Sequence, residues 1–111
     1  MRQRDKILSL LSIAARGGNI KSGEFQTEDA VKRGAARLVI VANDASDNTK
    51  KKFSDMCDFY GTDFKLYSDR ESLGGAIGKD YRASLCIVED GLAQKVLALV
   101  NEEEGSKEKL I

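Results

Sequence analysis

The apolar residues of this chain form two continuous runs and several runs with helical spacing. Residues 38–42 and 85–88 contain no polar side chain, and the first run is rich in β-branched residues. A strand with one face in water alternates apolar and polar positions, so a continuous run predicts a strand that is covered on both faces. Residues 64–67 alternate, which predicts a strand nearer the edge of the same sheet.

Helical spacing is clearest at the start of the chain. Apolar residues at positions 7, 10, 11 and 14 predict a helix over residues 3–16. Four more helices are predicted from turn and capping residues: Gly23 to Gly34, 48–60, a capping box at 68–71 leading to Gly78, and a helix capped by Asp90 that ends near residue 101. Residues 19–22 form an extended connector or a short strand.

This alternation of helices and strands predicts an α/β fold. Because the continuous strands need cover on both faces, the expected architecture is a three-layer α/β/α sandwich with a small four-stranded mixed sheet. A length of 111 residues fits one domain. We expect that domain to span residues 1–101, with a charged C-terminal tail at 102–111.

Composition argues against several classes of function. The chain has no histidine, so its serines and cysteines lack the commonest activating base and there is no typical metal site. We find no spaced carboxylate pair and no phosphate-binding glycine loop, and therefore expect no enzyme, no metal and no cofactor. The absence of a signal-peptide pattern and of a membrane-length apolar run predicts a cytoplasmic protein. Cys57 and Cys86 are expected to be buried without a disulfide.

Charge is balanced overall but not along the chain. The formal net charge is zero. Residues 1–23 carry five basic side chains and one acidic one, whereas residues 89–111 carry three basic and six acidic ones. Lysines 50–52 lie in the first turn of the third helix, where they are either solvated or bind an anion.

Three polar segments are candidates for a binding surface. Asn43 and Asp44 follow the first buried strand, where ligands gather in open α/β sheets; the alternative is that they only cap the next helix. The other two segments are residues 22–33 and the loop 79–82. In that loop Lys79 and Arg82 flank Tyr81, an arrangement that can stack on an exposed base, although it is also common on ordinary surfaces.

Several motifs together resemble one family over nearly the whole chain. They are Ser22-Gly23 before a helix, Arg33-Gly34 at its end, the strand and turn over 36–44, the Leu-Gly-x-Ala-Ile-Gly segment at 73–78, and the strand over 83–88. In this order they resemble the ribosomal protein L7Ae/L30e family. The run at 44–51 and the Ser-Gly-Glu start of the second helix resemble its small bacterial YlxQ-like branch.

The resemblance implies a non-enzymatic protein with an α/β/α sandwich that binds structured RNA, chiefly the kink-turn. It implies that the second helix enters the widened groove at sheared G·A pairs. It also implies that the loop at 77–83 holds a flipped-out nucleotide and that Asn43 and Asp44 contribute beside them. Recognition would then depend on RNA shape and exposed base edges.

The chain departs from the family pattern at the start of the second helix. The best kink-turn binders carry an Asn-Glu pair and, three residues later, a lysine, whereas this chain has Phe25, Gln26 and Asp29. Phe25 could stack on a base, and Asp29 places an anion near phosphate. Lys21, Lys32, Arg33 and Arg37 could compensate. The candidate RNA-binding residues are therefore Lys21, Gly23, Phe25, Gln26, Asp29, Lys32, Arg33, Asn43, Asp44, Lys79, Tyr81 and Arg82.

The sequence therefore predicts a monomeric RNA-binding protein associated with the ribosome or with translation. Its expected partner is structured RNA, either a kink-turn or ribosomal RNA, and no membrane. The main alternative is a protein-interaction module that keeps the fold but has lost RNA affinity. An enzyme on the same scaffold is the third hypothesis, and the missing histidine argues against it.

Overall fold

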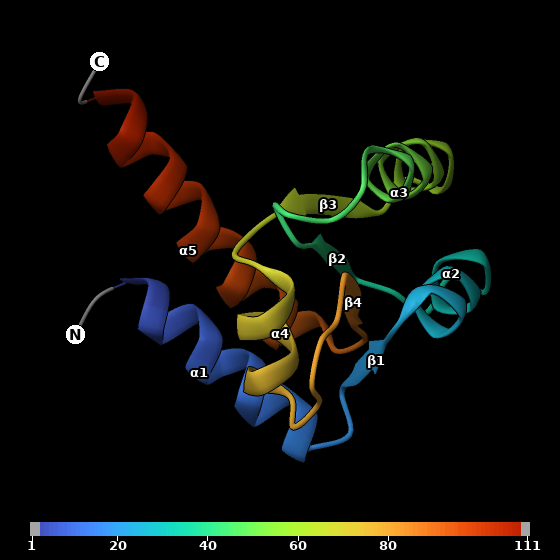
Figure 1. Ribbon diagram of the computed structural model, residues 1–111, viewed down its shortest axis with the longest axis horizontal. Helices are drawn as coiled ribbons and strands as arrows, with labels where there is room; N and C mark the ends of the chain where they lie inside the picture. Colours follow the sequence, from blue (N-terminus) through green and yellow to red (C-terminus); the bar gives the residue numbers. More distant parts are fainter. Residues whose placement is uncertain (1–2, 110–111) are drawn as a thin grey trace.

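Four short strands form one mixed sheet in the computed structural model, which describes residues 3–109, with side chains for 6–106 (Figure 1). The strands are β1 (Ile20–Ser22), β2 (Leu38–Val41), β3 (Asp63–Leu66) and β4 (Ser84–Ile87), and their order in the sheet is β1-β4-β2-β3. Strand β4 is antiparallel to both of its neighbours, and β2 is parallel to β3. This confirms the expected four-stranded mixed sheet.

The two continuous apolar runs occupy the centre of the sheet. Every residue of β2 and β4 is buried, whereas the edge strand β3 has exposed residues at both ends. In the register, Leu38 pairs with Ile87 and Ile40 with Leu85. A strand covered on both faces has no polar positions, which is why these runs could be recognised from the sequence.

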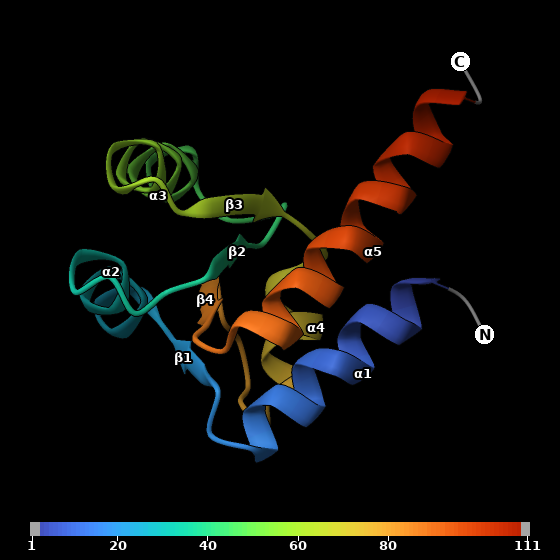
Figure 2. The ribbon, with the colours of Figure 1, turned by 180° about the vertical axis from the view of Figure 1, so that it is seen from behind.

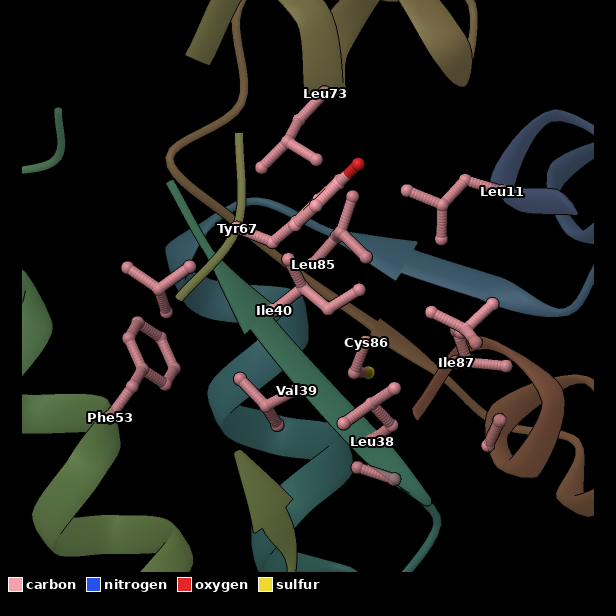
Figure 3. Packing of buried hydrophobic residues seen from close by; sticks show 14 of the residues in the cluster. Leu11, Leu38, Val39, Ile40, Phe53, Tyr67, Leu73, Leu85, Cys86 and Ile87 are labelled. Atoms are coloured by element: carbon pink, nitrogen blue, oxygen red, sulfur yellow. The ribbon is translucent and has the colours of Figure 1, made fainter. Parts of the chain in front are cut away.

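Five helices cover both faces of the sheet, so the predicted three-layer sandwich is confirmed. Helices α1 (Gln3–Arg16), α4 (Arg70–Ala76) and α5 (Asp90–Lys109) lie on one face, and α2 (Glu24–Lys32) and α3 (Asp47–Tyr60) lie on the other (Figures 1 and 2). Figure 3 shows Phe53 of α3 packing from one side, and Leu11 and Leu73 reaching the sheet from α1 and α4. The core therefore continues through the sheet.

Both cysteines belong to this core, as predicted. Cys57 and Cys86 are buried and free. Burial raises the pKa of the Cys57 thiol to about 12 and that of the Cys86 thiol to about 11. Both side chains therefore behave as small apolar groups at neutral pH.

The cap of α3 contradicts the alternative in which Asn43 and Asp44 only cap this helix. Ser46 is the N-cap, and its Oγ accepts a hydrogen bond of 3.1 Å from the Thr49 amide. Asn43 and Asp44 lie before the helix, so their side chains are available for other contacts. In a run of short polar residues, the backbone path decides which one reaches the helix terminus.

The caps of α4 and α5 are likewise displaced by one residue from their predicted positions. Asp69, rather than Ser68, caps α4 through a 2.7 Å hydrogen bond from a backbone amide. Ser68 itself takes a left-handed backbone conformation, with φ of 62°. At the start of α5, Glu89 rather than Asp90 accepts a backbone hydrogen bond of 3.0 Å.

The last helix extends beyond the predicted end near residue 101. Helix α5 continues to Lys109, so most of the expected tail at 102–111 is helical, and residues 110–111 lie outside the described part of the chain. Glutamate and lysine are good helix formers. A 2.8 Å ion pair between Lys65 of β3 and Glu104 also holds this extension against the sheet. No helix within residues 3–109 has the length and apolar character needed to cross a membrane.

Candidate functional site

Strand directions bring three polar segments to one end of the sheet. Strand β4 is antiparallel to β1 and β2, and β3 is parallel to β2. The strands β1, β2 and β3 therefore all end at the edge of the sheet where β4 begins. Ser22-Gly23, Asn43-Asp44 and the loop 79–82 therefore meet there, together with the start of α4. We call this set of residues, together with Arg70 and the first turn of α2, the polar end. The sequence had predicted that these segments could share a surface.

The loop 79–82 is tied to β1 through Arg82. The Arg82 Nε donates a hydrogen bond of 3.1 Å to the Ser22 Oγ, although the two residues are 60 positions apart in the chain. One terminal nitrogen of the same guanidinium donates to the Tyr81 carbonyl at 2.7 Å. Arg82 is therefore held across the gap between the loop and the start of α2.

Arg70 connects this loop to the turn after β2. Its backbone amide donates to the Asp44 Oδ1 at 2.9 Å, and its carbonyl accepts from the Arg82 amide at 3.0 Å. The Arg70 Nε also lies 3.5 Å from the Asp44 Oδ2. Asp44 thus contacts the first residue of α4 rather than α3, and one connected set of bonds spans Asp44, Arg70, Arg82 and Ser22.

A close approach of backbones sets the position of the loop. A Cβ atom built on Gly74 of α4 would lie 2.8 Å from the Asp80 carbonyl oxygen and 2.9 Å from the Tyr81 Cα. Those atoms belong to the backbone and cannot rotate away. At the neighbouring Gly75, a Cβ atom would meet no heavy atom within 4 Å. Only a glycine at position 74 allows the loop to pack this closely on α4.

The start of α2 offers groups for an anionic or aromatic ligand. Gly23 is the N-cap, with φ of 90°, and supplies no side-chain hydrogen bond to the first turn. Its own amide donates to the Ser84 carbonyl at 2.9 Å, which fixes α2 to β4. Uncapped amides at a helix N-terminus attract anions. Beside them Phe25 is 81% exposed, and Tyr81 in the loop is 62% exposed.

Asn43 and Gln26 contribute exposed amides to the polar end. The Asn43 backbone amide donates to the Ser68 carbonyl at 2.8 Å, which fixes the turn and leaves the side chain exposed. Gln26 is exposed in the first turn of α2, and Lys79 is exposed at the start of the loop. These side chains can donate or accept hydrogen bonds on base edges.

Lys32 and Arg33 lie at the other end of α2, away from the polar end. The Lys32 Nζ is 2.7 Å from the Glu28 Oε2, and the Arg33 Nε is 2.8 Å from the Asp29 Oδ2. Asp29 is therefore paired with a cation, which reduces the repulsion of phosphate that its position had suggested. Lys21 is exposed within β1, opposite Cys86.

Glu28 lies between two lysines on neighbouring helices. The Lys52 Nζ of α3 is 2.6 Å from the Glu28 Oε1 and 3.7 Å from the Glu24 Oε1. Hydrogen bonds from Lys32 and then Lys52 lower the pKa of Glu28 to about 2, and the same partnership raises the pKa of both lysines. Lys51 is also paired, with Asp55 at 2.9 Å. Two of the lysines at 50–52 therefore have carboxylate partners.

Arg70 and Gly74 are site residues that the sequence did not indicate. Arg70 follows a helix cap, where an arginine is unremarkable, and Gly74 entered only as part of the motif at 73–78, with no role assigned to it. The three-dimensional packing shows what distinguishes Gly74 from the adjacent Gly75. Among the described side chains, no group of three His, Cys, Asp or Glu residues is arranged to hold a metal ion.

Comparison with known proteins gives a consistent match. The family model described as the ribosomal protein L7Ae/L30e/S12e/Gadd45 family matches residues 5–98. The chain is 35% identical over 92 residues to the RNA-binding protein YlxQ of Bacillus subtilis, covering 83% of this chain and 92% of that protein. It is 39% identical over 98 residues to the RNA-binding protein YlxQ of Enterococcus faecium, covering 87% and 93%.

A ribosomal protein and two solved structures are also similar. The large ribosomal subunit protein eL8 of Cenarchaeum symbiosum is 28% identical, with 82% of this chain and 73% of that protein covered. A protein of unknown function from Bacillus halodurans superposes with a TM-score of 0.84 and 41% identity, covering 86% and 97%. The 15.5 kD RNA binding protein of Giardia lamblia gives 0.76 and 26%, covering 93% and 88%.

Proposed function

The chain belongs to the ribosomal protein L7Ae/L30e/S12e/Gadd45 family, and from this premise we propose that it is an RNA-binding protein that recognises structured RNA through the polar end. The observation that carries the proposal is the bonded set Asp44, Arg70, Arg82 and Ser22, which holds three segments in one surface before any ligand arrives. A surface held in its binding geometry loses little conformational entropy on association.

The chemistry of the polar end suits RNA that is bent or partly unstacked. Phe25 and Tyr81 offer exposed rings on which bases can stack, and the amides at the start of α2 attract phosphate. Gln26 and Asn43 supply hydrogen-bonding amides for base edges. We therefore assign recognition to shape and exposed bases, as is usual for structured RNA.

Within that proposal, the RNA is kink-turn-like. The start of α2 would face the sheared G·A pairs, and the loop 79–82 would hold a flipped-out nucleotide beside Asn43 and Asp44. Phe25 and Gln26 would replace the polar pair of strong binders by a stacked ring and one amide. The names of the relatives, RNA-binding protein YlxQ and ribosomal protein eL8, favour a place on the ribosome or in translation.

A pair of RNAs tests this proposal. The purified protein is titrated with a kink-turn RNA and with a control in which Watson–Crick pairs replace the sheared G·A pairs. We expect sub-micromolar binding to the first RNA and much weaker, salt-sensitive binding to the second. Equal, weak binding to both RNAs would contradict kink-turn recognition, and no binding to either would contradict the RNA-binding proposal.

A protein-interaction module is the second candidate function. The observation that favours it is charge neutrality: the cations of α2 are paired with Glu28 and Asp29, and the formal net charge is zero. In that case, partners recovered with the tagged protein from cells would persist after nuclease treatment. Loss of all partners on nuclease treatment would contradict this second candidate and would indicate that RNA is the ligand.

A further inference from the structure

A cleft lies beside the polar end, between the end of β3 and the C-terminal part of α5. Its volume is about 290 Å³. Leu66, Tyr67 and Ser68 line one side, Glu103 and Glu104 line the other, and Asn43 lies at its margin. We call it the Glu103 cleft. The family match ends at residue 98, so the acidic wall is formed by the part of α5 that extends beyond the family match.

Two residues that line this cleft each have a buried side-chain oxygen without a hydrogen-bond partner. These oxygens are the Ser68 Oγ and the Glu103 Oε2, and Ser68 as a whole is only 4% exposed. A polar atom shielded from water without a partner raises the free energy of the folded state, and this cost is greater for a carboxylate. A hydrogen-bond donor that enters the cleft and reaches these oxygens would therefore lower the free energy of the folded state.

The negative charge of the cleft favours a cation as its ligand. Glu104 is neutralised by Lys65, whose Nζ lies 2.8 Å from its Oε1. No ion pair is found for Glu103 among side chains 6–106, so within the described side chains its carboxylate has no cationic partner. Phosphates of RNA would be repelled by Glu102 and Glu103, so nucleic acid is disfavoured here.

The arrangement of acceptors favours a guanidinium over a metal ion or an ammonium. A hard metal ion prefers six or more oxygen ligands, and the described part of the chain has no group of three acidic, histidine or cysteine side chains arranged for one. A guanidinium carries five N–H donors in one plane and is weakly hydrated. It can donate to the Glu103 carboxylate, the Ser68 hydroxyl and the Asn43 amide oxygen while its face packs on Leu66 and Tyr67.

We propose that the Glu103 cleft binds the guanidinium of an arginine side chain carried by a partner protein. The inference goes beyond RNA binding and does not depend on it, because all the residues of the cleft except Asn43 lie outside the polar end. A partner docked here would lie next to Asn43, at the margin of the polar end. Protein and RNA ligands would then occupy adjacent surfaces of the same chain.

The test is a titration of the ¹⁵N-labelled full chain with N-acetyl-arginine methylamide, followed by NMR. We expect saturable shifts at the Asn43 side-chain amide and at the backbone amides of Ser68 and Glu103. The citrulline analogue has nearly the same shape but no charge, and should bind at least about tenfold more weakly because a hydrogen-bonded charge is lost. The lysine analogue should also bind more weakly than arginine.

Two matched variants distinguish a site from general attraction to an acidic helix. Glu103→Gln should weaken binding of the arginine derivative about tenfold, whereas Glu102→Gln, which removes the same charge from an exposed neighbour, should change it less than about twofold. Equal effects of the two variants would overturn the proposal, as would the absence of shifts in the unmodified chain.

One further arm uses RNA in place of the arginine derivative. If a single-stranded oligonucleotide shifts the Ser68 and Glu103 signals and the arginine derivative does not, the cleft binds bases and the proposal fails. The outcome is independent of the kink-turn experiment, since failure of RNA binding at the polar end would leave the arginine titration unchanged.

Discussion

Cations near the two ends of helix α2 are used in different ways. At the polar end, the side chains of Arg82 and Arg70, which belong to other segments, contact residues 60 and 26 positions away in the chain. At the other end, Lys32 and Arg33 bond to carboxylates four positions away on their own helix. We call this second set, with Phe59 and Tyr60 at the end of α3, the paired end.

This difference in the distance along the chain between a cation and its partner shows how basic residues on one small protein can have different roles. A cation that bonds across the fold holds separate segments together and fixes a surface. A cation paired within a helix turn neutralises its neighbour and adds little stability, because exposed ion pairs are screened. Both ends carry a phenylalanine that is 81% exposed, Phe25 and Phe59, so exposure alone does not mark a binding surface. The predictions below use this contrast.

The largest effect is expected from moving the loop at the polar end. Gly74→Ala places a Cβ atom against the backbone of Asp80 and Tyr81, so the loop must shift. RNA affinity should fall at least about tenfold and Tm by about 5 °C, as for other overpacked sites. Binding to the kink-turn RNA and thermal unfolding measure the two effects.

Gly75→Ala is the matched control for that variant. It lies in open space within the same helix, so alanine should leave RNA affinity unchanged and raise the stability slightly. Equal loss of affinity in both variants would show that helix α4, rather than the close approach at position 74, governs binding.

The next effect compares the two exposed phenylalanines. Phe25→Ala should weaken binding to the kink-turn RNA about tenfold if the ring stacks on a base. Phe59→Ala removes an equally exposed ring at the paired end and should change affinity less than twofold, the range of an indirect effect. Isothermal titration calorimetry with the kink-turn RNA measures both affinities. A larger loss of affinity for Phe59→Ala than for Phe25→Ala would indicate that the RNA binds at the paired end.

A smaller effect separates the arginines of the two ends. Arg82→Ala should weaken RNA binding several-fold and reduce the salt slope by about one, since it removes both a cation and the bond to Ser22. Arg33→Ala should have less effect on both, because Arg33 is already paired with Asp29. Affinities measured at several salt concentrations test this, and equal slopes for the two variants would contradict the assignment.

The smallest effect concerns the pH dependence of the paired end. The pKa of Glu28 is lowered to about 2, so its contribution to stability is present above the unfolded value of 4.5 and is lost as the pH falls toward 2. Glu28→Gln should slightly lower Tm at pH 7, and the difference from the unmodified chain should vanish near pH 2. A constant difference across that range would contradict the ion pairs, and RNA affinity at pH 7 should not change.

Patterns along the sequence predicted the layers of the fold better than its details. The apolar runs that became β2 and β4 were recognisable because burial on both faces removes every polar position. Helix α1 was predicted at its observed bounds by the 3.6-residue spacing. The caps of α3, α4 and α5 were less predictable, since several short polar residues adjoin each helix and only the backbone path selects one.

The candidate site was partly predictable for the same reason. Polarity and strand ends indicated that Asn43, Asp44 and the loop 79–82 could share a surface, and the strand directions bring them together. The bonds through Arg70 join residues far apart in the chain, and the packing of the loop on Gly74 brings backbones from two segments into contact. Neither the bonds nor this packing produces a periodic pattern of residues in the sequence. The predicted helix from Gly23 to Gly34 already placed Lys32 and Arg33 at its far end, but the pattern did not show that both are paired with carboxylates on the same helix.

The order of strands has a consequence for synthesis of the chain. Strand β4 separates β1 from β2, and β1 has no other neighbour in the sheet. While residues 84–87 remain within the ribosome, the first strand therefore has no partner to join. Ser22 and Asn43 come into place only after that last strand inserts between the first two. The polar end is thus assembled late in translation, and a fragment that stops before residue 84 would carry all of its residues without their shared surface.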